Sequence, residues 1–344
     1  MGVFVFLPLV LPLTAWPVAR LAEQHLHPRT ATRFLTAMAA VLALCSTVCL
    51  GLVMVVGTAQ LPGNPLPDGW SDPEVRAAVP FDEVVGKAAI PALCVVVVAC
   101  VRTLWRHARV RRRAHRALAG LPDTEVAVLP DGVPYAYALP GGGRRGIAAP
   151  RGGARRGGRP GAGEPHGRAG RRVRGRRGGR VVVTTALLDR LRPAERRALF
   201  AHERAHLAAR HDRFLLTVRL AARANPVLRP LRTAVAYTAE RWADEEAARA
   251  IGSRRTVARA IGTAALVSRG TPAPTLAGLA APGPVPRRVA ALLGPPPAVR
   301  NWPSVFTSVG LAAWGAAAGT AVSAMSSANS AVTMVLILHA ATPL

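Results

Sequence analysis

The sequence contains little cysteine and few aromatic residues. Its four cysteines are Cys45, Cys49, Cys94 and Cys100, and all lie in apolar runs, where a thiol behaves as a small apolar side chain. This placement excludes a disulfide framework and a cysteine-rich metal site. Only 5% of the residues are aromatic, and Lys87 is the only lysine among 45 basic residues. Such a strong preference for arginine is typical of a protein from a GC-rich genome.

Charged residues are missing from several long stretches. Residues 1–19, 34–57 and 301–344 contain no Asp, Glu, Lys or Arg, and residues 84–101 contain only Lys87. A helix needs about 20 apolar residues to cross a bilayer, so we predict four transmembrane helices, the last at residues 305–325. Buried helices of a soluble core are the alternative. That alternative is strongest for the first and third runs, which contain prolines and are shorter.

The charges of the loops predict an orientation. The N-terminus has no basic residue near its start and no small-residue cleavage site, so we expect it to stay as a membrane anchor. The loop at residues 20–33 is basic, and the loop at residues 58–87 is acidic. Residues 102–300 hold 40 of the 45 basic and 12 of the 18 acidic residues, a net +28. Because basic flanks stay in the cytoplasm, we predict a multi-pass cell-membrane protein with three spans in residues 1–101, a cytoplasmic domain at 102–300, and a fourth span with a short tail at 301–344.

One stretch of the predicted cytoplasmic domain differs from the rest. Residues 141–180 contain 13 arginines, 15 glycines, one glutamate and almost no apolar residues. Such a composition cannot bury a core, so we expect a disordered insertion. An arginine- and glycine-rich tract can also bind RNA or anionic lipid, but this one lacks the interleaved aromatic residues that nucleic-acid binding favours. A GC-rich region read out of frame is a third interpretation.

The remainder of residues 102–300 predicts an α+β domain. Residues 125–129 and 133–139 alternate in polarity around the turn sequence Pro130-Asp131-Gly132, which predicts a β-hairpin. Residues 181–185 predict a third strand. Helices are expected over residues 194–210, 214–224, 234–251 and 256–267.

The first of these helices contains the sequence His202-Glu203-Arg204-Ala205-His206. Helix positions four apart share a face, so both imidazoles can bind one zinc ion. Glu203 then lies beside the ion, where it can accept a proton from metal-bound water. The HExxH pattern therefore predicts one Zn²⁺ per chain and a catalytic glutamate.

A catalytic zinc site needs a third protein ligand and an open position for water. His211 lies about 140° around the helix from His206, so it can reach the metal only if the helix ends first. Glu240 and Asp244 lie on a helix face that should pack inward, because the face is otherwise made of small or apolar residues. Carboxylates there require compensation, which a metal ion and its histidines supply. We therefore predict Glu240 as the third ligand and Asp244 as an acceptor for a histidine N–H.

The neighbouring acids have a simpler interpretation. Glu245 and Glu246 fall on other faces of the same helix, where we expect them to pair with Arg241 and Arg249 in solvent. The sequence does not identify the residue that stabilises an oxyanion alongside zinc. His211 and Tyr237 are the two candidates.

These residues resemble a known group of enzymes. His202-Glu203-x-x-His206 followed by Glu240-x-x-x-Asp244 looks like the ExxxD variant of the HExxH zinc peptidases, which the HtpX-like and CAAX-protease enzymes share with the BlaR/MecR-type antirepressor peptidases. A cytoplasmic metal domain between the third and fourth of four spans is similar to the BlaR/MecR type. The resemblance implies a bacterial membrane protein with a zincin-like domain that hydrolyses peptide bonds. No penicillin-binding sensor domain follows the last predicted span, so antibiotic sensing is not carried over.

We therefore predict a mainly α membrane protein that is a zinc metalloendopeptidase. The resemblance implies a protein substrate, either a cytoplasmic repressor of the BlaI type or the enzyme itself, and the HtpX-like enzymes suggest misfolded membrane proteins instead. We expect the substrate to lie extended against the strand at residues 181–185. The alternative functions are an inactive membrane scaffold and a basic membrane-tethered binding protein. Glu203 argues against the scaffold, because an inactive homologue needs no base, and the composition does not favour a nucleic-acid partner.

The predicted topology can be tested with reporter fusions. A fusion after Gly69 should report the outside of the cell and a fusion after Gly270 the cytoplasm, because the acidic loop and the basic segment lie on opposite sides of the span at residues 84–101. Alkaline phosphatase and green fluorescent protein activities at the two sites measure this. If both sites report the same compartment, the predicted orientation is wrong.

Overall fold

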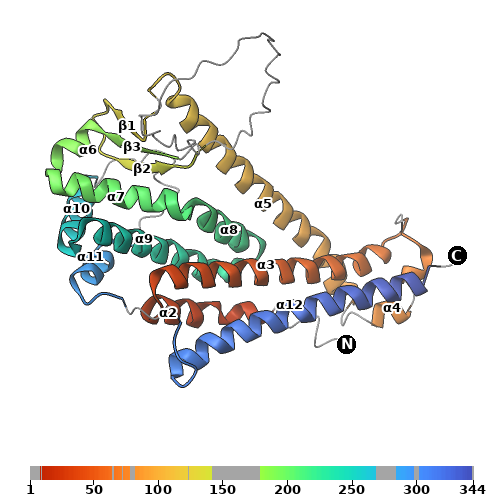
Figure 1. Cartoon of the computed structure of the whole chain (residues 1–344). Coiled ribbons are helices and arrows are strands. Elements are labelled where there is room, and N and C mark those ends of the chain that lie inside the picture. Colours follow the sequence, from red (N-terminus) through yellow and green to blue (C-terminus); the bar gives the residue numbers. More distant parts are fainter. Residues whose placement is uncertain are drawn as a thin grey trace, which may run out of the picture.

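The computed structural model describes residues 8, 10–63, 66–71, 73–77, 82–122, 124–141, 179–268, 284–297 and 302–342. It is mainly helical, with one small sheet at one end of the molecule (Figure 1). The predicted arginine- and glycine-rich insertion lies almost wholly outside the described residues. The division into domains stays a prediction, and its first boundary falls inside a continuous helix, α5 (Asp82–Ala117).

Within the described residues, three helices are long and apolar enough to cross a membrane. They are α3 (Pro28–Ala59), α5 and α12 (Ser308–Ala340). α3 and α5 include the predicted second and third spans, and α12 overlaps the predicted fourth span but begins three residues later and extends to Ala340. The predicted first span lies partly outside the described residues. Its described part forms the short turn η1 (Leu11–Thr14) and the helix α2 (Ala15–His25), whose 11 residues are too few to cross a bilayer. The four-span count therefore stays a prediction.

The helix α3 is the centre of the apolar bundle. It packs against α2, α5 and α12, and its N-terminal half also contacts two helices of the sheet-bearing part, α8 and α9. Near its other end the backbone of Gly57 meets the backbone of Gly86 in α5 so closely that a Cβ on either glycine would overlap the other helix. Small residues at such crossings are what bring membrane helices into contact. The segment between α3 and α5 carries η2 (Asp68–Ser71) and α4 (Pro73–Ala77).

The sheet contains three strands in the order β1-β3-β2. β3 (Arg180–Thr184) pairs in parallel with β1 (Val126–Leu129) and antiparallel with β2 (Ala136–Leu139). The predicted third strand is confirmed, but the predicted hairpin between the first two is wrong, because β3 lies between them. The loop joining β1 and β2 instead crosses the end of β3, where the carbonyl of Asp131 accepts a hydrogen bond from the backbone N–H of Ala186.

The helices after β3 build the rest of this part. Their bounds are α6 (Thr185–Arg190), α7 (Pro193–Ala209), α8 (His211–Ala224), η3 (Pro226–Leu228), α9 (Arg229–Ile251), α10 (Arg254–Val267) and α11 (Val285–Leu293). The four predicted helices of this region are confirmed within a few residues, apart from α9, which begins earlier. α7 begins with Pro193, at a position where a backbone N–H would have no acceptor within the helix, so proline loses no hydrogen bond there. The Glu195 carboxylate accepts a hydrogen bond from the Arg192 N–H. α9 ends at Gly252, whose φ of 74° suits glycine.

The close crossing of α3 and α5 predicts a difference between two glycines of α3. Gly57→Val should destabilise the protein by about 1–3 kcal/mol, because the added methyl groups overlap Gly86. Gly51→Val, on the same helix with no atom within 4 Å of an added Cβ, is the matched control. Thermal unfolding of both variants in detergent measures the effect. Equal unfolding temperatures would show that the two helices do not cross at Gly57.

Candidate metal centre

Two histidines of α7 meet on one face of that helix. His202 and His206 are one turn apart, and their Nε2 atoms lie 3.1 Å from each other. His202 is buried and His206 is partly buried. Two imidazole nitrogens this close, without a carboxylate between them, indicate that both face a common point.

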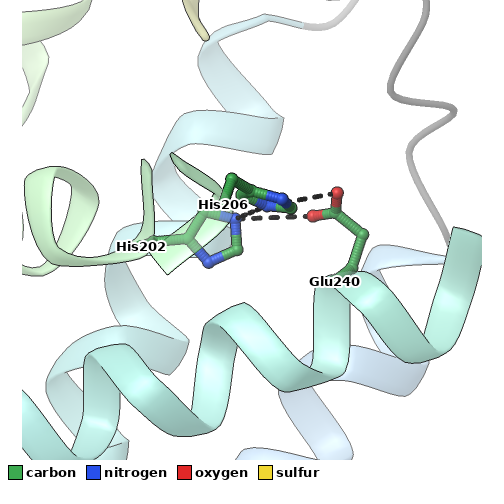
Figure 2. Close-up of side chains that lie close together, drawn as sticks. All are labelled: His202, His206 and Glu240. Atoms are coloured by element: carbon green, nitrogen blue, oxygen red, sulfur yellow. Dashed lines mark hydrogen bonds and ion pairs between the residues drawn. The ribbon is translucent and has the colours of Figure 1, made fainter. Parts of the chain in front are cut away.

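The third member of the group comes from α9, which packs against α7. The Glu240 carboxylate oxygens lie 3.4 Å from Nε2 of His202 and 3.5 Å from Nε2 of His206. Figure 2 shows the three side chains converging from the two helices. Ligand atoms at about 2.0–2.1 Å from a tetrahedral zinc ion lie roughly 3.3 Å from one another. The separations between the two Nε2 atoms, and between each Nε2 and one of the two Glu240 oxygens, are therefore close to those around a zinc ion, and the set of two imidazoles and a carboxylate suits it chemically.

Each histidine has a second neighbour at its other ring nitrogen. The Nδ1 atom of His202 lies 3.0 Å from Oδ1 of Asp244, one turn beyond Glu240 on α9. The Nδ1 atom of His206 lies 2.8 Å from Nδ1 of His211. Partners at this position fix the ring orientation and the tautomer of a ligating imidazole. The sequence predicts that Asp244 accepts an N–H from a histidine, and the structure places it beside His202.

His211 reaches the group because the helix ends before it. Arg210 has a φ of 56°, in the left-handed region, and this residue separates α7 from α8. His211 is almost completely buried, lies beside His206, and is not one of the three groups that converge on the common point. Tyr237, the other oxyanion candidate, does not line the cavity beside these groups and lies under the guanidinium of Arg287.

Arg288, which the sequence does not single out, joins the two carboxylates of the centre. Arg288 of α11 forms a two-pronged contact with Asp244, with its Nε 2.9 Å from Oδ2 and its Nη2 2.6 Å from Oδ1. Its Nη1 lies 2.9 Å from Oε2 of Glu240. All three residues are buried. In the sequence, Arg288 lies in a proline-rich segment far from the HExxH motif, so no local pattern distinguishes it from the many other arginines.

Burial and ion pairing oppose each other in this cluster. Burial alone would raise the pKa of the Glu240 and Asp244 carboxyls, but Arg288 and the nearby histidines hold both pKa values below their usual range. Burial would likewise lower the pKa of His202, but hydrogen bonds to Asp244 and Glu240 raise this pKa to about 10. A ligating imidazole must be neutral, so metal binding would displace the proton of His202. With neutral imidazoles, two carboxylates face one guanidinium, and the remaining negative charge suits a divalent cation.

The neighbouring acids have other partners. Glu246 pairs with Arg249, as predicted, and also accepts a hydrogen bond from the indole N–H of Trp242 at 3.2 Å. Glu245 lies 3.0 Å from Arg241, also as predicted, and pairs with Arg254 as well. However, Glu245 is buried, so the prediction that it pairs in solvent is wrong. Its pairing with two arginines explains how the charge is tolerated away from water.

A cavity of about 380 Å³ opens beside the three converging groups. Glu203, His202, His206 and Glu240 line it, together with apolar side chains of α7 and α10 and a continuous stretch around β2. β3 is the central strand of the sheet, so the expectation that a substrate pairs with it is wrong, because both its edges are occupied. Among the described strands, β2 is the edge strand that borders the cavity.

A comparison with known protein families agrees with this geometry. Residues 173–223 match the model of Peptidase family M48. The matched range contains β3, α6, α7 with its HExxH sequence, and all but the last residue of α8. This similarity supports a metallopeptidase. No curated protein and no solved structure is significantly similar to the chain.

The buried cluster predicts a large effect for Arg288 and a small one for its neighbour. Arg288→Met should destabilise the protein by about 3–5 kcal/mol, because it leaves two buried carboxylates without their cation. Arg287→Met removes the same charge from a side chain that is 45% exposed and pairs with Glu23, so it should cost about 1 kcal/mol. Thermal unfolding in detergent measures both. Equal losses would contradict the proposed importance of the buried cluster.

Proposed function

We propose that this protein is a membrane-integrated zinc metalloendopeptidase. The observation that carries the proposal is the convergence of His202, His206 and Glu240, with Glu203 of the same HExxH sequence lining the adjoining cavity. The similarity of residues 173–223 to Peptidase family M48 supports the same class. The three long apolar helices support a membrane location.

The roles follow from the positions of the side chains. His202, His206 and Glu240 would hold the zinc ion, with Asp244 orienting His202. When bound, the ion lowers the pKa of a coordinated water to about 7 and polarises the scissile carbonyl. Glu203, which lines the cavity, accepts the proton of the attacking water and passes it to the leaving amine. This role requires a carboxylate within reach of the water, and Glu203 is only partly buried.

The edge of β2 offers a place for the substrate. Residues 134–138 and 140 line the cavity, and β2 pairs with β3 on its inner side. An extended peptide can add to such an edge through backbone hydrogen bonds, which requires no particular side-chain sequence. Leu187, Leu199 and Ile261 line the same cavity and would contact apolar side chains of the peptide. We infer that the enzyme cleaves extended segments of proteins, at apolar positions.

The natural substrate is a protein that reaches the membrane surface. A cytoplasmic repressor of the BlaI type and the enzyme itself are the candidates that the BlaR/MecR resemblance suggests, and misfolded membrane proteins are the candidate that the HtpX-like resemblance suggests. We place the metal centre on the cytoplasmic side, supported by the net +28 of residues 102–300. An inactive scaffold would have no use for Glu203 beside the three converging groups.

Substitutions at the metal centre separate the base from the ligands. Glu203→Gln should keep zinc and lower proteolysis by about 100-fold or more, because the amide removes the base and leaves three ligands. His202→Ala, His206→Ala and Glu240→Ala should lose the metal as well, because two protein donors are too few for a stable catalytic site. Asp244→Asn should weaken metal affinity or activity about 10–100-fold. Bound zinc and cleavage of a co-expressed protein, or self-cleavage, are measured for each variant.

The matched control is Glu246→Ala, which removes a carboxylate of α9 from a partly exposed ion pair outside the cavity. It should retain zinc and activity. Loss of zinc in Glu246→Ala with retention in Glu240→Ala would mean that the third ligand is wrongly assigned. Full activity in Glu203→Gln would exclude the proposed peptidase mechanism.

A further inference from the structure

A second cleft lies between α5 and α8, at the point where the apolar part of α5 changes into its arginine-rich part. Its volume is about 530 Å³, and it is separate from the cavity at the metal centre. Figure 1 shows α5 leaving the α3–α12 bundle at a slant and passing α8 on its way to the sheet. The two helices are in contact, and α5 lines most of the cleft while α8 contributes Arg223.

One half of this cleft is apolar and faces outward. Val95, Val98 and Ala99 lie on one stripe of α5, and Val95 and Val98 are 67% and 57% exposed. Only 11% of the apolar window of α5 is buried within the protein, compared with 44% for α3 and 28% for α12. In a membrane, this face of α5 is therefore open to lipid chains.

The other half of the cleft is basic. Arg102 and Arg106 continue the same stripe of α5, and Arg223 faces them from the last turn of α8. All three are exposed, and none forms an ion pair with an acidic residue in the part of the chain that the structure describes. Arg219 and Arg232 lie close enough to interact electrostatically with each other, and Arg219 with Arg223 as well, so further positive charge lies near this end of α8.

The length of the cleft along α5 matches part of a phospholipid molecule. Val95 and Arg106 are 11 residues apart, which is about 16 Å along a helix. A phosphodiester headgroup together with the upper part of one acyl chain spans a similar length. Guanidinium groups bind phosphate oxygens through paired N–H donors, so three arginines at one end select an anionic group. An aqueous anion would use the arginines alone and leave the apolar half exposed.

We propose that this cleft binds one anionic phospholipid, with its phosphate between Arg102, Arg106 and Arg223 and an acyl chain along Val95, Val98 and Ala99. The lipid would join α5, a candidate membrane span, to α8, the helix that follows the HExxH helix. Basic pockets between membrane helices are suited to anionic headgroups in this way. The proposal is independent of the proposed peptidase function, because no residue of the metal centre takes part.

The test is native mass spectrometry of the full-length protein in detergent, titrated with phosphatidylglycerol or with phosphatidylcholine of the same acyl chains. The unmodified protein should retain one phosphatidylglycerol at least tenfold more tightly than phosphatidylcholine. The triple variant Arg102→Gln, Arg106→Gln, Arg223→Gln should lose this preference, because each arginine near an anionic lipid surface contributes about a fivefold change in binding. Ala99→Trp, which fills the apolar half, should also weaken retention.

The matched control is the triple variant Arg109→Gln, Arg112→Gln, Arg116→Gln, which removes the same charge from α5 beyond the cleft. It should retain phosphatidylglycerol within about twofold, since these residues do not line the cleft. Equal loss in both triple variants would overturn the proposal in favour of diffuse attraction to the basic helix. Displacement of the lipid by millimolar inorganic phosphate, or unchanged retention in Ala99→Trp, would overturn it as well, because either result would show a site for the phosphate alone.

Discussion

The structure of the metal centre depends on the buried guanidinium of Arg288 between the carboxylates of Glu240 and Asp244. Two carboxylates one turn apart on a buried helix face would repel each other and lose their hydration. A planar cation with several N–H donors satisfies both, and the other oxygen of Glu240, Oε1, lies 3.5 Å from Nε2 of His206. Because Arg288 belongs to α11, this short helix has to pack against α9 before the metal centre can take its shape.

The same constraint links the metal centre to the apolar bundle. α9, which carries both carboxylates, packs along the N-terminal half of α3, where the hydroxyl groups of Thr32 and Thr238 lie 3.0 Å apart. The guanidinium of Arg33 on α3 lies 5.4 Å from the ring of Trp242, which in turn contacts His211. A movement of α3 would therefore displace the side chains that orient His206. This direct packing distinguishes the protein from one in which a flexible linker separates the candidate metal centre from the apolar helices.

Much of the candidate site could be predicted because helical periodicity is a local property. The spacing of His202 and His206 puts them on one face, and the small-residue stripe around Glu240 and Asp244 predicts a buried face that needs a cation. The helix boundaries followed from proline and glycine. The hairpin failed for the opposite reason. Neighbouring strands with a turn between them usually pair, and nothing local shows that β3, about 40 residues later, inserts between them.

The sequence by itself determined which residues carry the chemistry: the HExxH on one helix, the paired acids on another, the long uncharged runs and the excess of arginine. The tertiary structure decided which of many similar groups act together. It selected Arg288 from the 45 basic residues, buried Glu245 against two arginines, and turned His211 back toward His206 through the left-handed conformation of Arg210. These choices depend on how helices distant in the sequence pack, and the burial of charge makes each of them energetically decisive.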